Sequence, residues 1–105
     1  MRHFLLVLAV LWLAACAEWV PLETQGQGVS VATAEKVRDC EYRGRTIVSV
    51  ADRVAGVERD QAKVAAELER LARNHAPKIG GDTIVPEGPV RDGERVYKVY
   101  RCHGQ

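Results

Sequence analysis

The sequence predicts an α+β domain in which a small mixed sheet of about four strands carries one long helix on one face. Residues 57–79 repeat apolar side chains every three or four positions, which is typical of a helix buried along one stripe. The segments on either side are short, rich in β-branched residues and bounded by glycine, proline or aspartate, which is typical of strands. The expected order is β-α-β-α-β-β within a single small α/β domain over residues 28–105.

The sequence pattern in the first half of this domain predicts two strands. Residues 28–32 alternate and are expected to form a short first strand, after which Thr33 is a candidate cap for one or two helical turns over residues 34–38. The strongest strand pattern covers residues 45–50, because four of its side chains are β-branched. Residues 51–56 are expected to form a loop.

The long helix is expected to bury one side and to expose the other. Lys63, Glu67, Arg70 and Asn74 fall opposite the apolar stripe, so they are expected to face solvent. Pro77 has no backbone N–H to donate, so the sequence predicts either a kink there or a helix that ends near His75 and continues as a further turn. Gly80-Gly81 then ends the helical segment. The stripe consists of Val57, Val64, Leu68, Leu71, Ala72, His75, Ala76 and Ile79.

The second half predicts a hairpin. Residues 82–86 read as a short buried strand closed by its proline, residues 87–93 as a loop with two turn signals, and residues 94–101 as the last strand. A strand-helix-strand crossover is expected to make the strands around Ile47 and Ile84 parallel, and the last two strands are expected to pair with each other. The helix is expected to cover one face of the sheet.

The N-terminus has the order of a lipoprotein signal. Arg2 and His3 precede an apolar run, and Leu13-Ala14-Ala15-Cys16 then ends it as a lipobox does. The run is far shorter than the roughly 20 residues that a membrane-spanning helix needs. We therefore expect residues 1–15 to be removed and Cys16 to be the lipidated first residue of the mature chain. The alternatives are an ordinary signal peptide cut after Ala15 and an uncleaved anchor.

A polar tether is expected to follow the lipidated cysteine. Residues 16–27 contain proline and glycine, which interrupt helices and strands, and threonine and glutamine, which make the segment polar. Trp19 lies three residues from the acyl chains, so its side chain is placed either in the headgroup layer or, together with Leu22, back on the domain. Ala17 is not aspartate, which by resemblance to enterobacterial lipoproteins favours the outer membrane.

Charge and cysteine content narrow the class of protein. The chain has 15 Lys and Arg against 14 Asp and Glu, and removal of residues 1–15 takes away Arg2 and leaves the charges balanced. A balanced chain without a basic stripe gives no case for nucleic acid binding. Two of the three cysteines remain once Cys16 carries lipid, and in an exported protein Cys40 and Cys102 are most simply a disulfide.

The residues also resemble a known family. The match covers nearly the whole mature chain and is most telling over residues 72–86 and at Tyr100-Arg101-Cys102. On these residues the chain resembles a family of small proteobacterial lipoproteins of unknown function, the YjeI-like family, which is distantly similar to the Rcs envelope-stress sensor lipoprotein RcsF. The resemblance implies an outer-membrane lipoprotein with a disulfide-bonded α/β domain on its periplasmic side, and it brings no activity with it. The chain departs from the family at Pro77 and from RcsF in having only one spare cysteine pair. The matching segments are Cys16-Ala17-Glu18-Trp19-Val20, Val29-Ser30-Val31, Cys40, Gly44, Ala72-Arg73-Asn74, Ala76, Gly80, Asp82-Thr83-Ile84-Val85-Pro86 and Tyr100-Arg101-Cys102.

No residue pattern predicts catalysis or a cofactor. A zinc site needs cysteine and histidine ligands at short spacing, and the chain has no such pair apart from the adjacent Cys102-His103, whose side chains diverge on a strand. The cysteine pair is therefore predicted to be a disulfide, with free or regulatory thiols and a metal site as alternatives. His75, on the apolar stripe, is expected to be a hydrogen-bonded core residue. Asp39 and Glu41 flank Cys40 without any feature that separates them from solvated charges.

Two functions are compatible with these observations. The first is a tethered binding or sensing module that contacts another envelope protein, because a leash raises the local concentration of a domain near membrane partners. The second is a maintenance lipoprotein that binds cell-wall or lipid material. The sequence predicts neither an enzyme nor a nucleic-acid-binding protein, and it names no cofactor.

Overall fold

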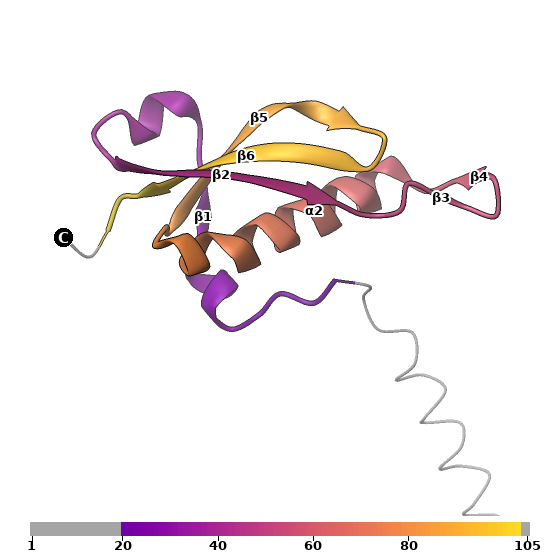
Figure 1. Ribbon diagram of the computed structural model, residues 1–105, viewed down its shortest axis with the longest axis horizontal. Coiled ribbons are helices and arrows are strands. Elements are labelled where there is room, and N and C mark those ends of the chain that lie inside the picture. The colour runs from indigo at the N-terminus through magenta and orange to yellow at the C-terminus, as the bar shows by residue number, and fades with distance from the viewer. Residues whose placement is uncertain (1–19, 104–105) are drawn as a thin grey trace, which may run out of the picture.

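A four-stranded mixed sheet with one helix on one face forms the body of the protein, so the predicted α+β class is confirmed. The computed structural model describes residues 20–103. Figure 1 shows helix α2 along one face of the sheet, with the chain entering below it. The elements are η1 (Gln25–Gly28), β1 (Ser30–Val31), η2 (Ala34–Val37), β2 (Glu41–Ser49), β3 (Arg53–Val54), β4 (Val57–Glu58), α2 (Gln61–His75), η3 (Ala76–Ile79), β5 (Thr83–Arg91) and β6 (Glu94–Arg101).

The sheet has the strand order β1-β5-β6-β2. Strand β1 pairs with β5 in parallel, whereas β6 pairs antiparallel with both β5 and β2. The strands around Ile47 and Ile84 therefore run in the same direction, as predicted, but β6 lies between them. The predicted hairpin of the last two strands is confirmed, and Asp92 and Gly93 at its tip have positive φ values of 50° and 74°, as a tight two-residue hairpin requires.

The prediction that Pro86 closes its strand is wrong, because β5 continues to Arg91. Pro86 pairs with Tyr97 on the β6 side. On the other side, β1 is only two residues long and its register ends at Ile84. Pro86 therefore lies where β5 is an edge strand, and its missing N–H costs no ladder hydrogen bond. The predicted loop over residues 87–93 is instead strand as far as Arg91, with an irregular register between Glu87 and Arg91, and only residues 92–93 form the turn.

Helix α2 begins at Gln61, four residues later than predicted. Val57 belongs to β4, which pairs with β3 in a two-stranded sheet, and its side chain is 69% exposed. The predicted loop over residues 51–56 is therefore part of a small hairpin. Asp60 caps the helix, because its side chain accepts a 2.9 Å hydrogen bond from the backbone N–H of Ala62.

Helix α2 ends at His75, which is the second of the two outcomes predicted for Pro77. The chain continues as the 3-10 turn η3, with Pro77 near its start, where a missing N–H is tolerated. Gly80 follows in the left-handed conformation at φ 81°, and the N–H of Gly81 bonds the carbonyl of Ala76 at 2.8 Å. This arrangement satisfies the last helical carbonyls before the chain enters β5.

The core lies between α2 and the face of the sheet that it covers. Leu68 and Ala72 of α2 are fully buried against Ile84 and Val99 of the sheet. Tyr97 is also 1% exposed; burial raises the pKa of its phenol, and the nearby Arg95 guanidinium lowers that pKa only in part. The full core cluster is Val29, Val48, Val64, Leu68, Ala72, Ala76, Ile84, Tyr97 and Val99.

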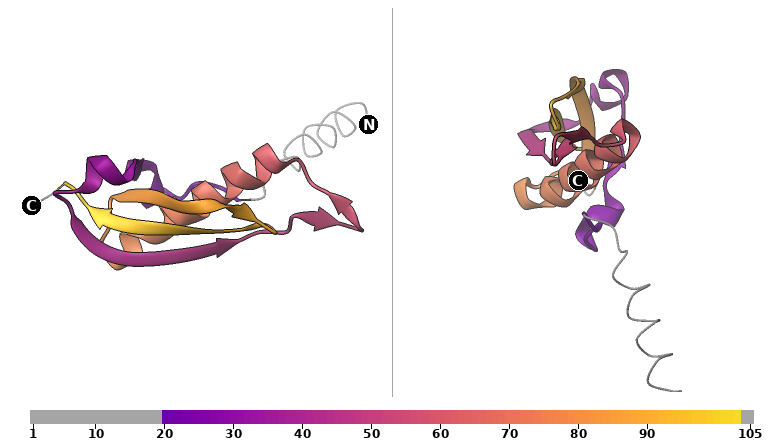
Figure 2. Two further views of the ribbon diagram at one scale, coloured as in Figure 1. Left: turned by 90° about the horizontal axis from the view of Figure 1, so that it is seen from above. Right: turned by 90° about the vertical axis from the view of Figure 1, so that its right-hand side faces the viewer.

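The opposite side of the sheet is covered only in part. Figure 1 shows the turn η2 on the other side of the sheet from α2, and Figure 2 shows the same elements from above and from one end. Val37 of η2 is buried, as are Thr83 and Val85, whose positions in β5 point away from α2. The turn η2 covers only the end of the sheet where β2 begins and β6 ends. Over the rest of β2 and β6, no element of the described chain covers the side that faces away from α2.

Candidate functional site

Three features of the structure carry chemical information: an N-terminal strap on α2, a disulfide corner and an uncovered face of the sheet. We call residues 20–28 the strap. Cys16 and Trp19 lie outside the described residues, so the predicted lipidation site and the placement of Trp19 stay predictions. Among the described residues, no helix is long and apolar enough to cross a membrane.

Side chains of α2 bind the strap along its length. Asn74 accepts a 2.8 Å hydrogen bond from the N–H of Glu23 and donates a 3.0 Å bond to the carbonyl of Pro21. Arg70 donates to the carbonyl of Val20 at 2.8 Å, and Arg73 donates to a carbonyl of η1. The predicted domain therefore extends toward the N-terminus, with residues 20–28 packed on the helix.

The expectation that Asn74 faces solvent is wrong, because its side chain is 7% exposed beneath the strap. Gly26 explains how closely the strap approaches: a Cβ built there would lie 2.5 Å from Asn74 Oδ1 and 3.2 Å from the carbonyl carbon of Arg73. Only glycine allows this contact without displacement of the chain. Leu22, which the sequence named as a residue that could fold back onto the domain, does so: it is half-buried between Pro21 and Glu23, whose backbones both bond Asn74.

Glu67 is the second residue of α2 that the sequence placed wrongly on the solvent side. It is 4% exposed and forms an ion pair with Arg59, which precedes the helix. Arg59 also donates to the carbonyl of Ala51 at 2.7 Å, so it joins the helix to the loop after β2. Glu67 Oε1 has no hydrogen-bond partner within the described structure. We interpret the Glu67–Arg59 pair as a structural contact that joins the helix to the loop after β2.

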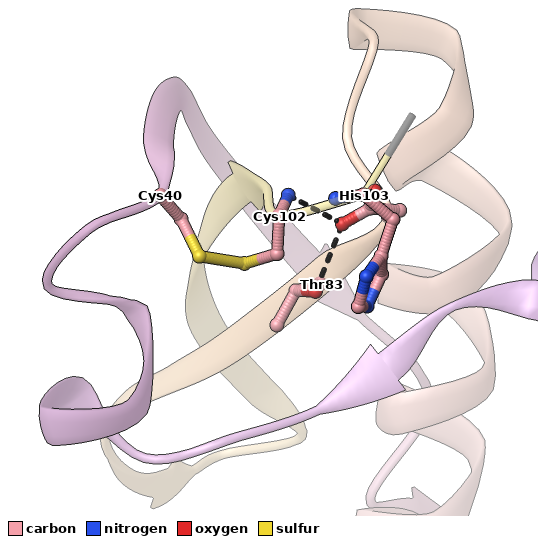
Figure 3. Close-up of a disulfide and its surroundings, with 5 residues drawn as sticks. Cys40, Thr83, Cys102 and His103 are labelled. Atoms are coloured by element: carbon pink, nitrogen blue, oxygen red, sulfur yellow. Dashed lines mark hydrogen bonds between the residues drawn. A yellow bond between two sulfur atoms is a disulfide. The ribbon is translucent and has the colours of Figure 1, made fainter. Parts of the chain in front are cut away.

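The structure joins Cys40 and Cys102 in a disulfide, with their Cα atoms 4.7 Å apart. Figure 3 shows the bond linking the end of the segment that follows η2 to the end of β6. Glu41 and Arg101 are the last paired residues of β2 and β6, so the two cysteines stand opposite each other one position further on. The backbone N–H of Cys40 bonds the carbonyl of Val37, and this contact ties η2 to the same corner.

Asp82 organises the other half of the disulfide corner. Its carboxylate accepts 2.8 Å hydrogen bonds from the backbone N–H groups of Cys102 and His103 and a 2.9 Å bond from the Thr83 hydroxyl. Partial burial raises the pKa of this carboxyl, but the two backbone bonds and the hydroxyl lower it more, so the pKa of Asp82 lies below its ordinary value. The sequence presented Asp82 only as the start of a strand.

The two histidines of the described structure, His75 and His103, make hydrogen bonds to groups other than the cysteines. His75 is half-buried, and its Nδ1 lies 3.0 Å from the hydroxyl of Thr46 in β2, so it is hydrogen-bonded at the edge of the core, close to expectation. His103 contacts Asp82 through its backbone N–H. Within residues 20–103, no three His, Cys, Asp or Glu side chains gather as metal ligands would.

The uncovered side of β2, β5 and β6 is a mixed surface, which we call the open face. Tyr42 and Ile47 are 52% and 61% exposed. Tyr42 and Tyr100 form an edge-to-face pair with ring centroids 5.5 Å apart. Arg45 and Glu87 form a 3.0 Å ion pair from the two strands that flank β6. The open face consists of Tyr42, Arg45, Ile47, Glu87, Val96, Lys98 and Tyr100.

A shallow hollow of about 330 Å³ lies beside this face at the tip of the β5–β6 hairpin. Charged side chains dominate its lining, whereas small-molecule sites are mostly apolar with a few polar groups. Several of these charges are already engaged, since Glu87 pairs with Arg45 and Arg95 donates to the carbonyl of Gly88. The hollow is therefore a gap between satisfied side chains.

One signal for the strap was present in the sequence. Asn74 is a short polar residue with poor helix propensity in the interior of a predicted helix, and such residues stay there when the side chain has a specific partner. Its partner, however, is backbone some 50 residues away, which no helical pattern reveals. The open face follows from strand alternation once β6 is known to separate β2 from β5.

Comparison with known proteins identifies a family whose function is unknown. A family model described as a domain of unknown function, DUF4156, matches residues 20–102. The match begins at the first residue of the strap and ends at the second cysteine of the disulfide. No curated protein and no solved structure matches the chain.

Proposed function

The chain belongs to the DUF4156 family of domains of unknown function, and we propose that it is an outer-membrane lipoprotein, anchored through Cys16, whose domain is a binding or sensing module of the envelope. The open face is the observation that carries this proposal. Its exposed tyrosine and isoleucine lie beside an ion pair, and exposed apolar groups with a polar rim are typical of interaction surfaces. A resemblance to the YjeI-like lipoproteins and, more distantly, to RcsF supports the same proposal.

Two further observations support an exported, anchored protein. The Cys40–Cys102 disulfide suits an oxidising compartment such as the periplasm. Leu13-Ala14-Ala15-Cys16 supplies a lipobox four residues before the strap begins. The intact mass of the membrane-purified protein tests the anchor: it should equal a chain that starts at Cys16 plus lipid, and Cys16→Ser should abolish that species. A mature chain that starts at Ala17 or an unmodified Cys16 contradicts the anchor.

Site-specific photo-crosslinking in intact cells tests the open face. A photo-reactive residue replaces Ile47 on that face or, as a matched control, Val57, which is equally apolar and 69% exposed on the small hairpin. We expect a discrete crosslinked protein from position 47 and none from position 57. Equal crosslinking from both positions, or none from either, contradicts a binding surface on the open face.

The alternative function is a maintenance lipoprotein that binds cell-wall material. The Tyr42–Tyr100 pair favours it, because an exposed aromatic ring offers an apolar face on which a sugar ring can pack. The same crosslinking separates the two functions, since murein fragments at position 47 in place of a protein favour the alternative. Co-sedimentation of the Tyr42→Ala variant with purified murein then measures the contribution of the ring, with Tyr97→Phe in the core as a control that leaves the open face unchanged.

A further inference from the structure

Three basic side chains of α2 lie on its outward side, next to the strap. Lys63 and Arg70 are two helical turns apart, and Arg73 follows three residues later, so all three point away from the Leu68 side that faces the sheet. Arg70 and Arg73 reach carbonyls of the strap, which places their guanidinium groups beside it. Two carboxylates lie between Lys63 and Arg70 in the sequence: Glu67 is buried and ion-paired with Arg59, and Glu69 is close enough to Tyr97 of the sheet to help raise the pKa of that phenol. We call Lys63, Arg70 and Arg73 the basic flank.

The strap runs alongside the basic flank, so the N-terminal end of the described chain lies close to it. Residues 20–28 are fixed to α2 by hydrogen bonds with the side chains of Asn74, Arg70 and Arg73. The contact at Val20 lies one helical turn closer to the start of α2 than the contacts of Asn74, so the chain leaves the domain toward Lys63. Only residues 17–19 separate Val20 from Cys16, and a fully extended chain of four residues spans about 14 Å.

We propose that the basic flank rests on the anionic phospholipid headgroups of the membrane that holds Cys16. This inference depends on the proposed lipidation. A short leash keeps the flank within reach of the surface, and a basic patch close to a membrane is attracted to anionic lipids. The acyl chains on Cys16 would anchor the protein, and the basic patch would then decide how the domain lies on the surface. The domain then has one orientation on the membrane instead of swinging on a free tether.

The orientation has a consequence for the open face. The helix lies between the basic flank and the sheet, and the open face is on the other side of the sheet from the helix. With the flank on the headgroups, Tyr42 and Ile47 point away from the membrane. The strap therefore presents the binding surface to the periplasmic space, where a protein or cell-wall partner is accessible.

Amine labelling of the lipidated protein in vesicles tests this orientation. The protein is reconstituted in phosphatidylcholine vesicles with or without phosphatidylglycerol, or kept in detergent, and the rates of Lys63 and Lys36 are compared by mass spectrometry. Lys36 is the internal control, because it is exposed on η2 at the other side of the sheet. We expect Lys63 to react several-fold more slowly, relative to Lys36, in vesicles that contain phosphatidylglycerol than in detergent.

Flotation of the same vesicles separates the two levels of the proposal. Protein that does not float contradicts the lipid anchor and with it the proposed function. Protein that floats but shows the same Lys63 to Lys36 ratio as in detergent overturns the orientation and leaves the anchor standing. Equal protection of Lys63 in vesicles of phosphatidylcholine alone overturns the role of anionic lipid.

A strap variant tests whether the orientation depends on the contacts seen here. Asn74→Ala removes both hydrogen bonds that hold residues 21–23, and we expect it to float normally while Lys63 regains its detergent labelling rate. Thr24→Ala is the matched control, since it lies in the strap and its side chain makes no capping bond. Unchanged Lys63 protection in Asn74→Ala contradicts the strap as the orienting element. The comparison of vesicle compositions uses the unaltered protein and holds even if this variant folds poorly.

Discussion

Cys40 and Cys102 face each other across the end of the β2–β6 ladder, one position beyond the pair Glu41 and Arg101, with 4.7 Å between their Cα atoms. The disulfide closes a loop of 62 residues, and chain-entropy arithmetic for such a loop gives about 4 kcal/mol of stabilisation. We expect the Cys40→Ser, Cys102→Ser double variant to lose about that much free energy of unfolding in a denaturant melt. The control is the unaltered protein measured under reductant, which should unfold at the same denaturant concentration as the double variant. Thiols that alkylate freely before reduction would contradict the bond and favour redox-sensing thiols.

Asp82→Asn tests the carboxylate that holds the backbone of Cys102 and His103. The pKa of Asp82 is lowered in the folded protein, so around pH 4 the unfolded chain binds more protons than the folded one. The ionised Asp82 carboxylate therefore stabilises the fold fully at pH values above the unfolded pKa, near 3.8. This stabilisation is lost as the pH falls through the lower folded pKa. We expect Asp82→Asn to lower the free energy of unfolding at neutral pH and the difference to shrink below about pH 4. Asp39→Asn, at an exposed position beside the same disulfide, serves as control; a difference that stays constant with pH contradicts the assignment.

Leu68→Ala tests the packing of α2 on the sheet. Leu68 is fully buried in the core cluster, and such a truncation costs about 2–5 kcal/mol of unfolding free energy. Val57→Ala removes a smaller apolar side chain that is 69% exposed on the small hairpin, and it should change stability by less than about 0.5 kcal/mol. Denaturant melts of the two variants at one pH provide the comparison. Equal small effects would mean that the apolar side of α2 is a surface and not a core.

Gly26→Ala tests the close approach of the strap to α2. The new methyl group would collide with Asn74 Oδ1 and the backbone of Arg73, and overpacking of this kind typically costs about 1–3 kcal/mol. Gly28→Ala is the matched control, because a Cβ there meets nothing within 4 Å. Hydrogen exchange gives the direct readout: the Glu23 amide, which donates to Asn74, should lose protection in Gly26→Ala and keep it in Gly28→Ala. Retained protection in both variants would contradict the proposed clamp.

Local pattern was sufficient for several features. Val64, Leu68, Ala72 and Ala76 repeat at helical spacing and all are buried, because this spacing puts them on the one side that packs against the sheet. Residues 94–101 alternate, and the strand has these bounds, since successive side chains of a strand point to opposite faces. With Cys16 predicted to carry lipid, the two remaining cysteines had only each other for a disulfide, and the structure brings them together.

Other features depended on contacts between distant segments. Glu67 and Asn74 look solvent-exposed on a helical wheel, but Arg59 covers one and the strap covers the other. Pro86 looks like the end of a strand, but β1 is too short to need its N–H. In each case the sequence set which groups can bond, through side-chain chemistry and local periodicity. The tertiary structure decided which of them are buried, because burial depends on backbone that arrives from up to some 50 residues away along the chain.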